Sequence, residues 1–395
     1  MADVGRDRLH FLDALRGLAA LYVVIFHVMY VGVAQANLPF PAYWQAVEFG
    51  GTGVFLFFVI SGFSLCLTWG RHAKAPWPEA NYAISRFFRI APLFYVVLGG
   101  LLAQGLWLFR YVPGLGLLIP NLAFLFNLLP GKQEGIVPAS WAIGVEMLFY
   151  TAFPALRRLP LGIALGGSLA LFGALLTLAG PVEYPNYAYW TVIGWLPLFA
   201  IGMCAYGAFA RWHARVTLGV PLALTGLLLL IACAVVPHAQ TTALLRVPIG
   251  LGYAVVLVGL GLRTNRVVVN AATQFLGKIS FSVYLLHPLV LRAIIGIFPA
   301  IYHSAGVQLG FLVCSALELA IVLPVAFIAY HLVEAPGERL GKHVAAALAR
   351  GLQSRLETSP GSGAPTRHGV AGGHRPAVAP AAAKSRSRAA RRKDR

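Results

Sequence analysis

Apolar runs of about twenty residues recur along the whole chain, and they constrain its fold more than any other feature. A helix that crosses the hydrocarbon of a bilayer needs roughly 20 predominantly apolar residues. Ten such stretches are present, at 11–31, 52–70, 87–109, 139–157, 161–180, 189–210, 217–236, 243–262, 278–300 and 307–332. Of the 395 residues, only 11% are charged, whereas soluble domains average about 25%. The sequence therefore predicts an all-α integral membrane protein with about ten transmembrane helices.

The distribution of basic residues predicts how these helices are oriented. One set of loops carries most of the arginines and lysines, and the alternate loops carry few. Because basic loops stay in the cytoplasm, we expect a multi-pass protein of the inner (plasma) membrane with both termini cytoplasmic. The same topology accounts for the net charge of +18, so we expect no nucleic-acid partner.

The two ends of the chain need separate interpretation. Residues 1–36 could be a cleaved signal peptide, but their apolar run is longer than the usual h-region of about 7–15 residues. We therefore interpret it as the first span. Residues 336–395 are rich in Gly, Pro, Ala, Ser, Arg and Lys, a composition that cannot bury a core. We expect a transmembrane domain over 1–335 and a disordered basic cytoplasmic tail over 336–395, which contacts anionic lipid headgroups.

Two features of the apolar sequence argue against a further membrane span and against a disulfide or metal site. The run 115–129 contains Pro120 and is too short to span, so we expect a re-entrant or interfacial segment there. All four cysteines lie in apolar runs and are interpreted as small core residues. We therefore expect no disulfide framework and no metal site.

The first span carries three ionisable residues, Asp13, Arg16 and His27. Eleven residues of helix sweep close to three full turns, so Arg16 and His27 share a face and lie about 16 Å apart along the axis. Asp13 could simply pair with Arg16, which would leave His27 as a structural histidine. Ionisable groups inside a bilayer are costly and by default mark functional pathways, so we favour a path through the membrane along this face.

Two other segments carry charged residues at the membrane. Arg86 and Arg89 lie one turn apart at the cytoplasmic start of the third span. They could be topological anchors or a fork that binds phosphate oxygens. Glu146 lies about 10 Å into the fourth span from the outer side, a depth comparable to that of His27. It is interpreted either as a structural hydrogen-bond hub or as the partner that orients His27.

Uncharged polar residues and a second histidine lie within other spans. Ser61 and Gly62 stand mid-span, where close helix packing through small residues is the favoured interpretation. Tyr284 and His287 share a face of the ninth span, and Pro288 follows them. His287 is interpreted as a pore-lining or structural group.

Five segments that fall between residues 9 and 287 carry most of these features, in the order LDALRGLAALYVVIFH, FFVISGF, SRFFRIAPLFY, SWAIGVEMLFY and LGKISFSVYLLH. Taken together and in this order, they resemble the acyltransferase 3 family of membrane-bound O-acyltransferases. The resemblance implies transfer of an acyl group, commonly acetyl, from cytoplasmic acyl-CoA to a hydroxyl of a saccharide. Acceptors in the family include surface polysaccharide, lipopolysaccharide, peptidoglycan and macrolide glycosides. It also implies acyl-CoA as co-substrate and no permanently bound cofactor.

The resemblance assigns roles to particular residues. Arg16, Arg86 and Arg89 would bind the phosphates of CoA. His27, supported by Glu146, would act as general base on the acceptor hydroxyl or carry the acyl group covalently. Many members have a second acidic residue after the glutamate, where this chain has Met147. The supporting or pore-lining candidates are Asp13, Ser61, Ser140, Trp141, Tyr150, Tyr284 and His287.

Several alternatives stay open at this point. The acceptor could be a cell-surface or exported saccharide, or the sugar of a macrolide or another glycosylated metabolite. A protein of another class, a secondary transporter, would use the intramembrane charges as a substrate path; the absence of recognisable internal repeats argues against it. Some family members carry a fused periplasmic domain, and we expect none here. The acyl group, the mechanism and the oligomeric state are not predicted.

Overall fold

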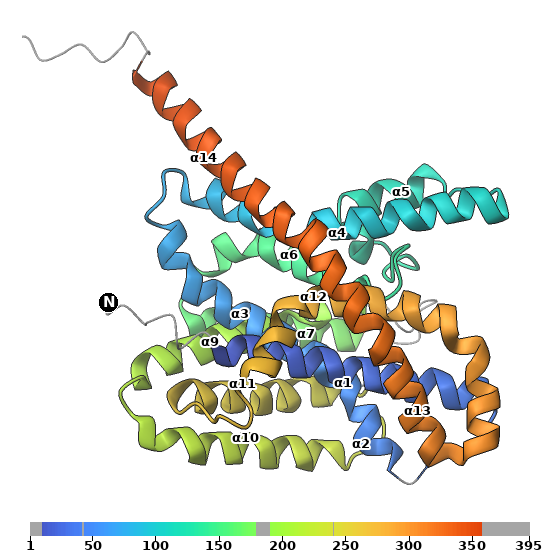
Figure 1. The fold of residues 1–395 in the computed structure, drawn as a ribbon. Coiled ribbons are helices and arrows are strands. Elements are labelled where there is room, and N and C mark those ends of the chain that lie inside the picture. Colours follow the sequence, from blue (N-terminus) through green and yellow to red (C-terminus); the bar gives the residue numbers. More distant parts are fainter. Residues whose placement is uncertain (1–9, 42, 179–189, 240, 358–395) are drawn as a thin grey trace, which may run out of the picture. The chain divides into compact units, whose positions relative to one another are not determined.

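The computed structural model describes residues 10–41, 43–178, 190–239 and 241–357, and every regular element in these ranges is helical (Figure 1). The all-α prediction is therefore confirmed. The main elements are α1 (His10–Gln35), α2 (Trp44–Glu48), α3 (Gly53–His72), α4 (Pro78–Phe109), α5 (Leu115–Leu122), α6 (Trp141–Leu156), α7 (Leu161–Leu178), α9 (Leu196–Trp212), α10 (Gly219–Ala234), α11 (Arg246–Leu262), α12 (Ala271–Ile294), α13 (Phe298–Ala329) and α14 (Ala335–Glu357).

These helices coincide with the predicted spans. Each of the ten predicted stretches contains one long helix. Seven helical segments of the described ranges are long and apolar enough to cross a membrane, and one of them, 271–351, contains both α12 and α13. The helix α6 is apolar but has only 16 residues. The chain is thus a multi-pass membrane protein, and the number of ten crossings and the cytoplasmic termini stay predictions.

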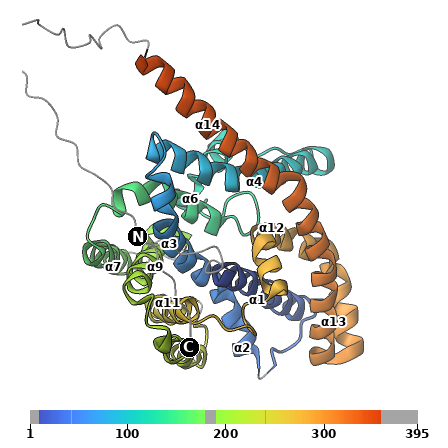
Figure 2. The same ribbon diagram turned by 60° about the vertical axis from the view of Figure 1, so that its left-hand side comes forward.

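The helices α1 and α12 lie side by side with their backbones in contact (Figures 1 and 2). A Cβ atom on Gly17 would lie 2.6 Å from the carbonyl oxygen of Thr273, and one on Gly277 only 1.9 Å from that of Asp13. Further along both helices His27 meets His287. Because residue numbers rise together from one contact to the next, the two helices are parallel, which agrees with the prediction that they are the first and ninth spans.

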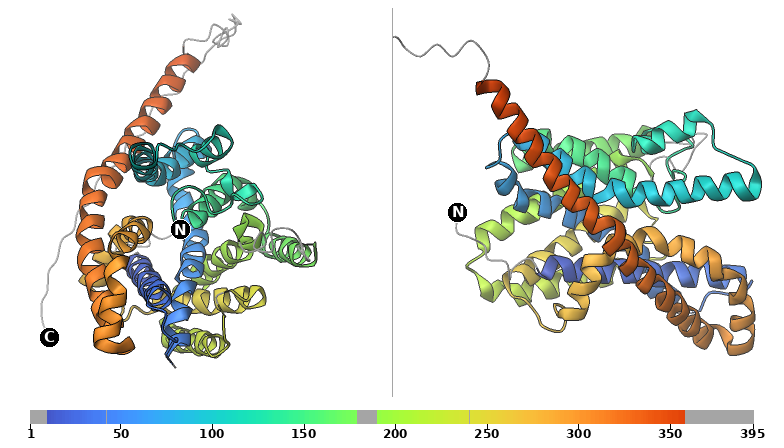
Figure 3. Two further views of the ribbon diagram at one scale, coloured as in Figure 1. Left: turned by 90° about the vertical axis from the view of Figure 1, so that its right-hand side faces the viewer. Right: turned by 45° about the horizontal axis from the view of Figure 1, so that its top comes forward.

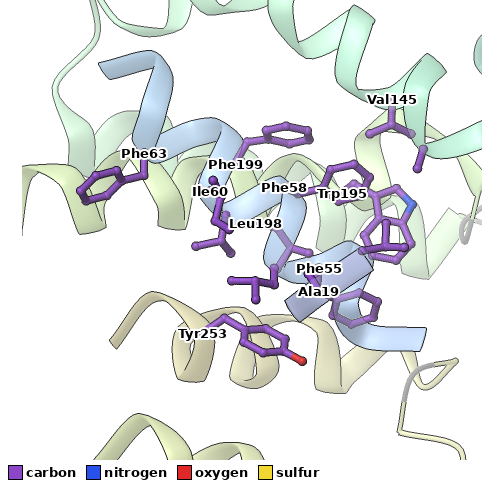
Figure 4. Packing of buried hydrophobic residues seen from close by; sticks show 14 of the residues in the cluster. Ala19, Phe55, Phe58, Ile60, Phe63, Val145, Trp195, Leu198, Phe199 and Tyr253 are labelled. Carbon is purple, nitrogen blue, oxygen red and sulfur yellow. The ribbon is translucent and has the colours of Figure 1, made fainter. Parts of the chain in front are cut away.

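A second close contact joins α3 to α9. Cβ atoms on Gly62 and Gly202 would each lie 2.1 Å from a carbonyl oxygen of the facing helix. The prediction that Gly62 serves close helix packing is confirmed. Around this contact the ring of Phe58 lies 4.8 Å from Phe199 and 5.3 Å from Trp195, as Figure 4 shows. These rings fix α3, which carries Ser61 toward the site described below.

The expectation of a disordered tail from residue 336 is wrong for residues 336–357. A π-helical turn, Tyr330–Glu334, follows α13 and leads directly into α14. The helix α14 passes over α4 (Figure 3). In α14, Gly337 and Gly341 leave room for Pro92 and Phe88 of α4, because a Cβ atom at either position would lie 2.6 Å from those side chains. The residues of this segment are mostly good helix formers such as Ala, Leu, Arg and Glu, which a count of aromatic and β-branched residues overlooks. The rest of the predicted tail lies outside the described residues.

The interrupted apolar run after α4 forms only the eight-residue helix α5, a 3₁₀ turn (Phe126–Leu128) and loops. At about 1.5 Å per residue such a helix cannot cross a bilayer. This agrees with the prediction of a non-spanning segment. The described residues up to Arg350 belong to one compact unit.

Candidate active site

Two histidines from separate helices meet at the centre of the candidate site. Nε2 of His287 lies 3.4 Å from Nδ1 of His27, and the ring centroids are 4.9 Å apart. His287 is fully buried, whereas His27 is partly buried. The contact between Gly17 and Gly277 described above sets the register that brings the two rings together. The sequence identified both histidines but did not indicate that they touch.

Hydrogen bonds to the backbone determine which nitrogen of each ring carries the proton. Nδ1 of His27 lies 2.8 Å from the carbonyl oxygen of Val23, and Nδ1 of His287 lies 2.7 Å from that of Tyr284. A carbonyl oxygen only accepts, so both Nδ1 atoms are donors. Nε2 of each neutral ring then keeps its lone pair. Among the described residues Nε2 of His27 has no hydrogen-bond partner, so it is free to accept a proton from a substrate.

A pocket with about 570 Å³ of empty volume, counting the space at its open side, lies between the helices, and neither His27 nor His287 lines it. It combines two basic residues, one acidic residue and hydroxyl groups with an apolar wall. The polar residues that line it are Arg16, Ser61, Arg89, Glu146, Ser280 and Tyr284. The pocket thus joins residues of α1, α3, α4, α6 and α12, which are far apart in the sequence.

Tyr284 connects this pocket to the histidine pair. Its side chain lines the pocket, and its ring centroid lies 5.8 Å from that of His287. Its hydroxyl donates a hydrogen bond of 3.0 Å to the carbonyl oxygen of Ala139, which fixes the ring. A substrate in the pocket would therefore lie one side chain away from His287.

Glu146 does not pair with His27, which corrects the role that the resemblance implied and leaves the other interpretation, a structural hydrogen-bond hub. Its Oε1 accepts hydrogen bonds of 2.5 Å from the hydroxyl groups of both Ser61 and Tyr150, and it interacts electrostatically with Arg89. Equal depth in two spans does not place two residues together, because the neighbours of α6 are α3 and α4. Ser61 likewise does more than pack helices, since it holds this carboxylate.

The three arginines differ in their surroundings. Arg16 contacts Oδ1 of Asp13 at 3.6 Å, which is the pairing that the sequence left as the alternative, and it also donates to Ser64 at 3.0 Å. Arg16 and Arg89 line the pocket.

The third arginine, Arg86, is absent from the residues that line the pocket. It donates to Oγ1 of Thr68 at 3.2 Å, and its guanidinium lies 5.8 Å from the ring of Tyr82 and 5.7 Å from that of Tyr150. The predicted two-arginine fork is therefore divided between the pocket and the adjacent helix packing.

Two other predicted residues lie away from the pocket. Ser140 donates to the carbonyl oxygen of Glu134 at 3.0 Å and belongs to the turn before α6. The ring of Trp141 packs against Trp190 and Trp195, at centroid distances of 4.9 and 5.2 Å. Both residues therefore shape the start of α6 rather than the pocket wall.

A second carboxylate was not identified from the sequence. Glu334, in the π-helical turn, is buried and accepts a hydrogen bond of 2.7 Å from Ser282 of α12, and it interacts electrostatically with Arg89. An acidic residue at the end of the last apolar run was a usable signal, because such groups are rare at the edge of a span. π-Helical turns also occur frequently at functional sites.

Comparison with known proteins identifies the family. The family model described as an acyltransferase domain matches residues 9–331, which is most of the chain. The exopolysaccharide production protein ExoZ of Rhizobium meliloti (strain 1021) is 27% identical over 327 residues, which cover 74% of this chain and 91% of ExoZ. No solved structure matches. The match across nearly all of the helical domain, together with the Arg16–His27 face and the basic pocket, shows that the chain belongs to the acyltransferase 3 family and is an acyltransferase.

Proposed function

We propose that this protein moves an acyl group, usually acetyl, from acyl-CoA to a hydroxyl of a cell-surface or exported saccharide. The observation that carries the proposal is the connection of a basic pocket to a histidine with a free lone pair. Arg16 and Arg89 line the pocket, Tyr284 links it to His287, and His287 contacts His27. This order matches the order of groups in an acyl-CoA, from phosphates to thioester.

The basic end of the pocket suits the phosphates of CoA. Guanidinium groups bind phosphate oxygens bidentately, and Arg16 of α1 and Arg89 of α4 line the same cavity. Glu146 and Glu334 interact electrostatically with Arg89. Their negative charge would limit the excess positive charge of the pocket while no substrate is bound.

The reaction is assigned to His27. Nε2 would take the proton of the acceptor hydroxyl as its oxygen attacks the thioester carbon. The carbon–sulfur bond then breaks, and the same proton passes from Nε2 to the thiolate of CoA. During the step the Nδ1–H group of the charged ring donates to the carbonyl oxygen of Val23 and faces Nε2 of His287. His287 acts as a positioning residue. An acyl group carried on Nε2 of His27 is the covalent variant of the same geometry.

The proposed orientation puts Arg16 at the cytoplasmic face of the inner membrane and His27 nearer the outer face. It rests on the basic loops. Acyl-CoA would enter from the cytoplasm, and the acceptor would reach His27 from the other side. The name of ExoZ, an exopolysaccharide production protein, supports an exported polysaccharide as the acceptor.

Purified protein with acetyl-CoA, and separately a strain that lacks the gene, test this proposal. We expect release of free CoA thiol only when a saccharide acceptor is present, and a mass gain of about 42 Da on the saccharide, as for one acetyl transferred to oxygen. The polysaccharide of the deletion strain should lose those acetyl groups. A normal polysaccharide together with loss of acetyl from a glycosylated small molecule would contradict the proposed acceptor.

A further inference from the structure

Aromatic side chains form a continuous row that begins at His27. The ring of Phe26 lies 4.8 Å from the imidazole of His27 and 5.8 Å from the ring of Tyr30. Tyr30 in turn lies 6.1 Å from Trp44, and Trp44 lies 4.2 Å from Phe40. We call these four residues, Phe26, Tyr30, Phe40 and Trp44, the aromatic row. It occupies the end of α1 that is remote from Arg16 and the segment that leads to α2.

Neighbouring rings of the aromatic row are stacked on one another rather than merely close. Three successive pairs are stacked, with interplanar angles of 25° for Phe26–Tyr30, 23° for Tyr30–Trp44 and 30° for Phe40–Trp44. The row also changes from buried to open along its length. Phe26 is buried, whereas Tyr30 is 51% exposed and Phe40 is 41% exposed. Aromatic side chains are thus exposed at one end of the row, and its buried end lies next to the histidine.

The loop that carries Phe40 is held in shape by its own sequence. Asn37 takes a left-handed conformation with φ 53°, and the amide of Leu38 donates to the carbonyl oxygen of Val33 at 3.2 Å. Phe40 lies between Pro39 and Pro41, whose rings fix φ near −65°. The loop therefore presents the ring of Phe40 without a large entropic penalty for ordering it on binding.

Interfacial anchoring is the ordinary explanation for exposed aromatic residues in a membrane protein. It does not require the rings to stack in register or to begin at a candidate catalytic histidine. Trp107 of α4, which is 86% exposed, has the exposure of an anchor and belongs to no such row. Unlike Trp107, the rings of the aromatic row stack on one another and begin next to His27.

We propose that the aromatic row binds a pyranose ring of the acceptor saccharide and delivers its hydroxyl to Nε2 of His27. A pyranose presents an apolar face of C–H groups with slight positive charge, which suits the negative face of an aromatic ring. Its hydroxyl groups point sideways, so one of them can face His27 while the ring is stacked. This inference rests on the proposed function, because it assigns a recognition surface to the acceptor of that reaction.

Kinetics with variants of the row test the inference. The donor is acetyl-CoA, and the acceptors are deacetylated oligosaccharides from the host's own exopolysaccharide and, separately, glycerol, which has no ring. In Tyr30→Ala and Trp44→Ala we expect the oligosaccharide KM to rise about tenfold, as for loss of one aromatic anchor. The KM for acetyl-CoA and the rate with glycerol should not change, and Trp44→Phe should restore most of the affinity. Trp107→Ala is the matched control and should behave like the wild type.

The outcomes separate this inference from the proposed function. If the wild type acetylates the oligosaccharides and the row variants keep its acceptor KM, the row is only a membrane anchor and the inference is wrong. Binding of the oligosaccharides, followed by saturation-transfer NMR, gives a readout that needs no turnover. Binding lost in Tyr30→Ala but without transfer by the wild type would leave the inference standing and contradict the proposed function. A wild type that neither binds nor acetylates the oligosaccharides would contradict both.

Discussion

The local sequence of α1 predicted part of the site around His27. The spacing of Arg16 and His27 predicted a shared face, and the alternative pairing of Asp13 with Arg16 is present at 3.6 Å. The backbone bond to Val23, four residues earlier, is also local to α1 and leaves Nε2 of His27 free. The prediction that Glu146 is the partner of His27 was wrong. Contacts between side chains of different helices depend on the packing register of those helices and not only on the depth of each residue in the membrane.

At the scale of single residues, substitutions of Arg89 and Arg86 should differ in their effect on the KM for acyl-CoA. Arg89 lines the pocket, whereas Arg86 contacts Thr68 and aromatic rings. We expect Arg89→Ala to raise the KM for acyl-CoA by roughly 10- to 100-fold, since a hydrogen bond to a charged group contributes about 1.5–3 kcal/mol. Arg86→Ala should raise it less and lower stability instead. Equal KM effects of the two substitutions, measured in the same membranes, would show that the pocket is not the phosphate site.

At the scale of elements, glycine contacts decide which helices are neighbours. Each of the ten predicted stretches holds a long helix, because hydrophobic length is a local property. The pairing of α1 with α12 is not local. It requires Gly17 and Gly277, and nothing in the sequence around Gly17 indicates that a residue 260 positions later lies against it. The same limit applies to α14, whose glycines face α4.

Gly277→Ala tests this pairing directly. Its new Cβ atom would overlap the carbonyl oxygen of Asp13, so α1 and α12 must separate and His27 must move from His287. Overpacking of this kind costs about 1–3 kcal/mol, and we expect a lower melting temperature and a large loss of turnover. Gly99→Ala in α4 is the control, since no atom lies within 4 Å of its new Cβ. Normal turnover and stability in Gly277→Ala would show that the contact is not tight.

At the scale of the whole molecule, composition correctly predicted a multi-pass helical membrane protein. It failed at the C-terminal boundary, because a helix that packs through glycine and alanine carries few of the aromatic and β-branched residues that mark a core. The described part of α14 contacts α4 close to Arg89 through Gly337 and Gly341. The compact unit therefore extends past residue 335 and includes the start of α14.

Two truncations distinguish the helix from the remainder of the predicted tail. A chain that ends at Glu357 keeps every described contact, and we expect near wild-type specific activity per membrane-inserted molecule. A chain that ends at Glu334 loses the packing of Gly337 and Gly341 on Pro92 and Phe88. We expect it to have a lower melting temperature and a higher KM for acyl-CoA. Equal activity and stability of the two truncated proteins would show that α14 contributes nothing to the pocket.

The most direct test of the account is the acyl-transfer rate of His27→Gln, measured together with acyl-CoA binding. Glutamine keeps polarity and hydrogen bonding but cannot take up the hydroxyl proton. We predict that the variant inserts and binds acyl-CoA normally while its transfer rate falls by about 10²–10⁴, the usual contribution of a general base. Glu146→Gln, which keeps an oxygen for Ser61 and Tyr150, should retain far more of the rate. A near wild-type rate in His27→Gln would contradict the account and move the search for the base to His287 or Glu146.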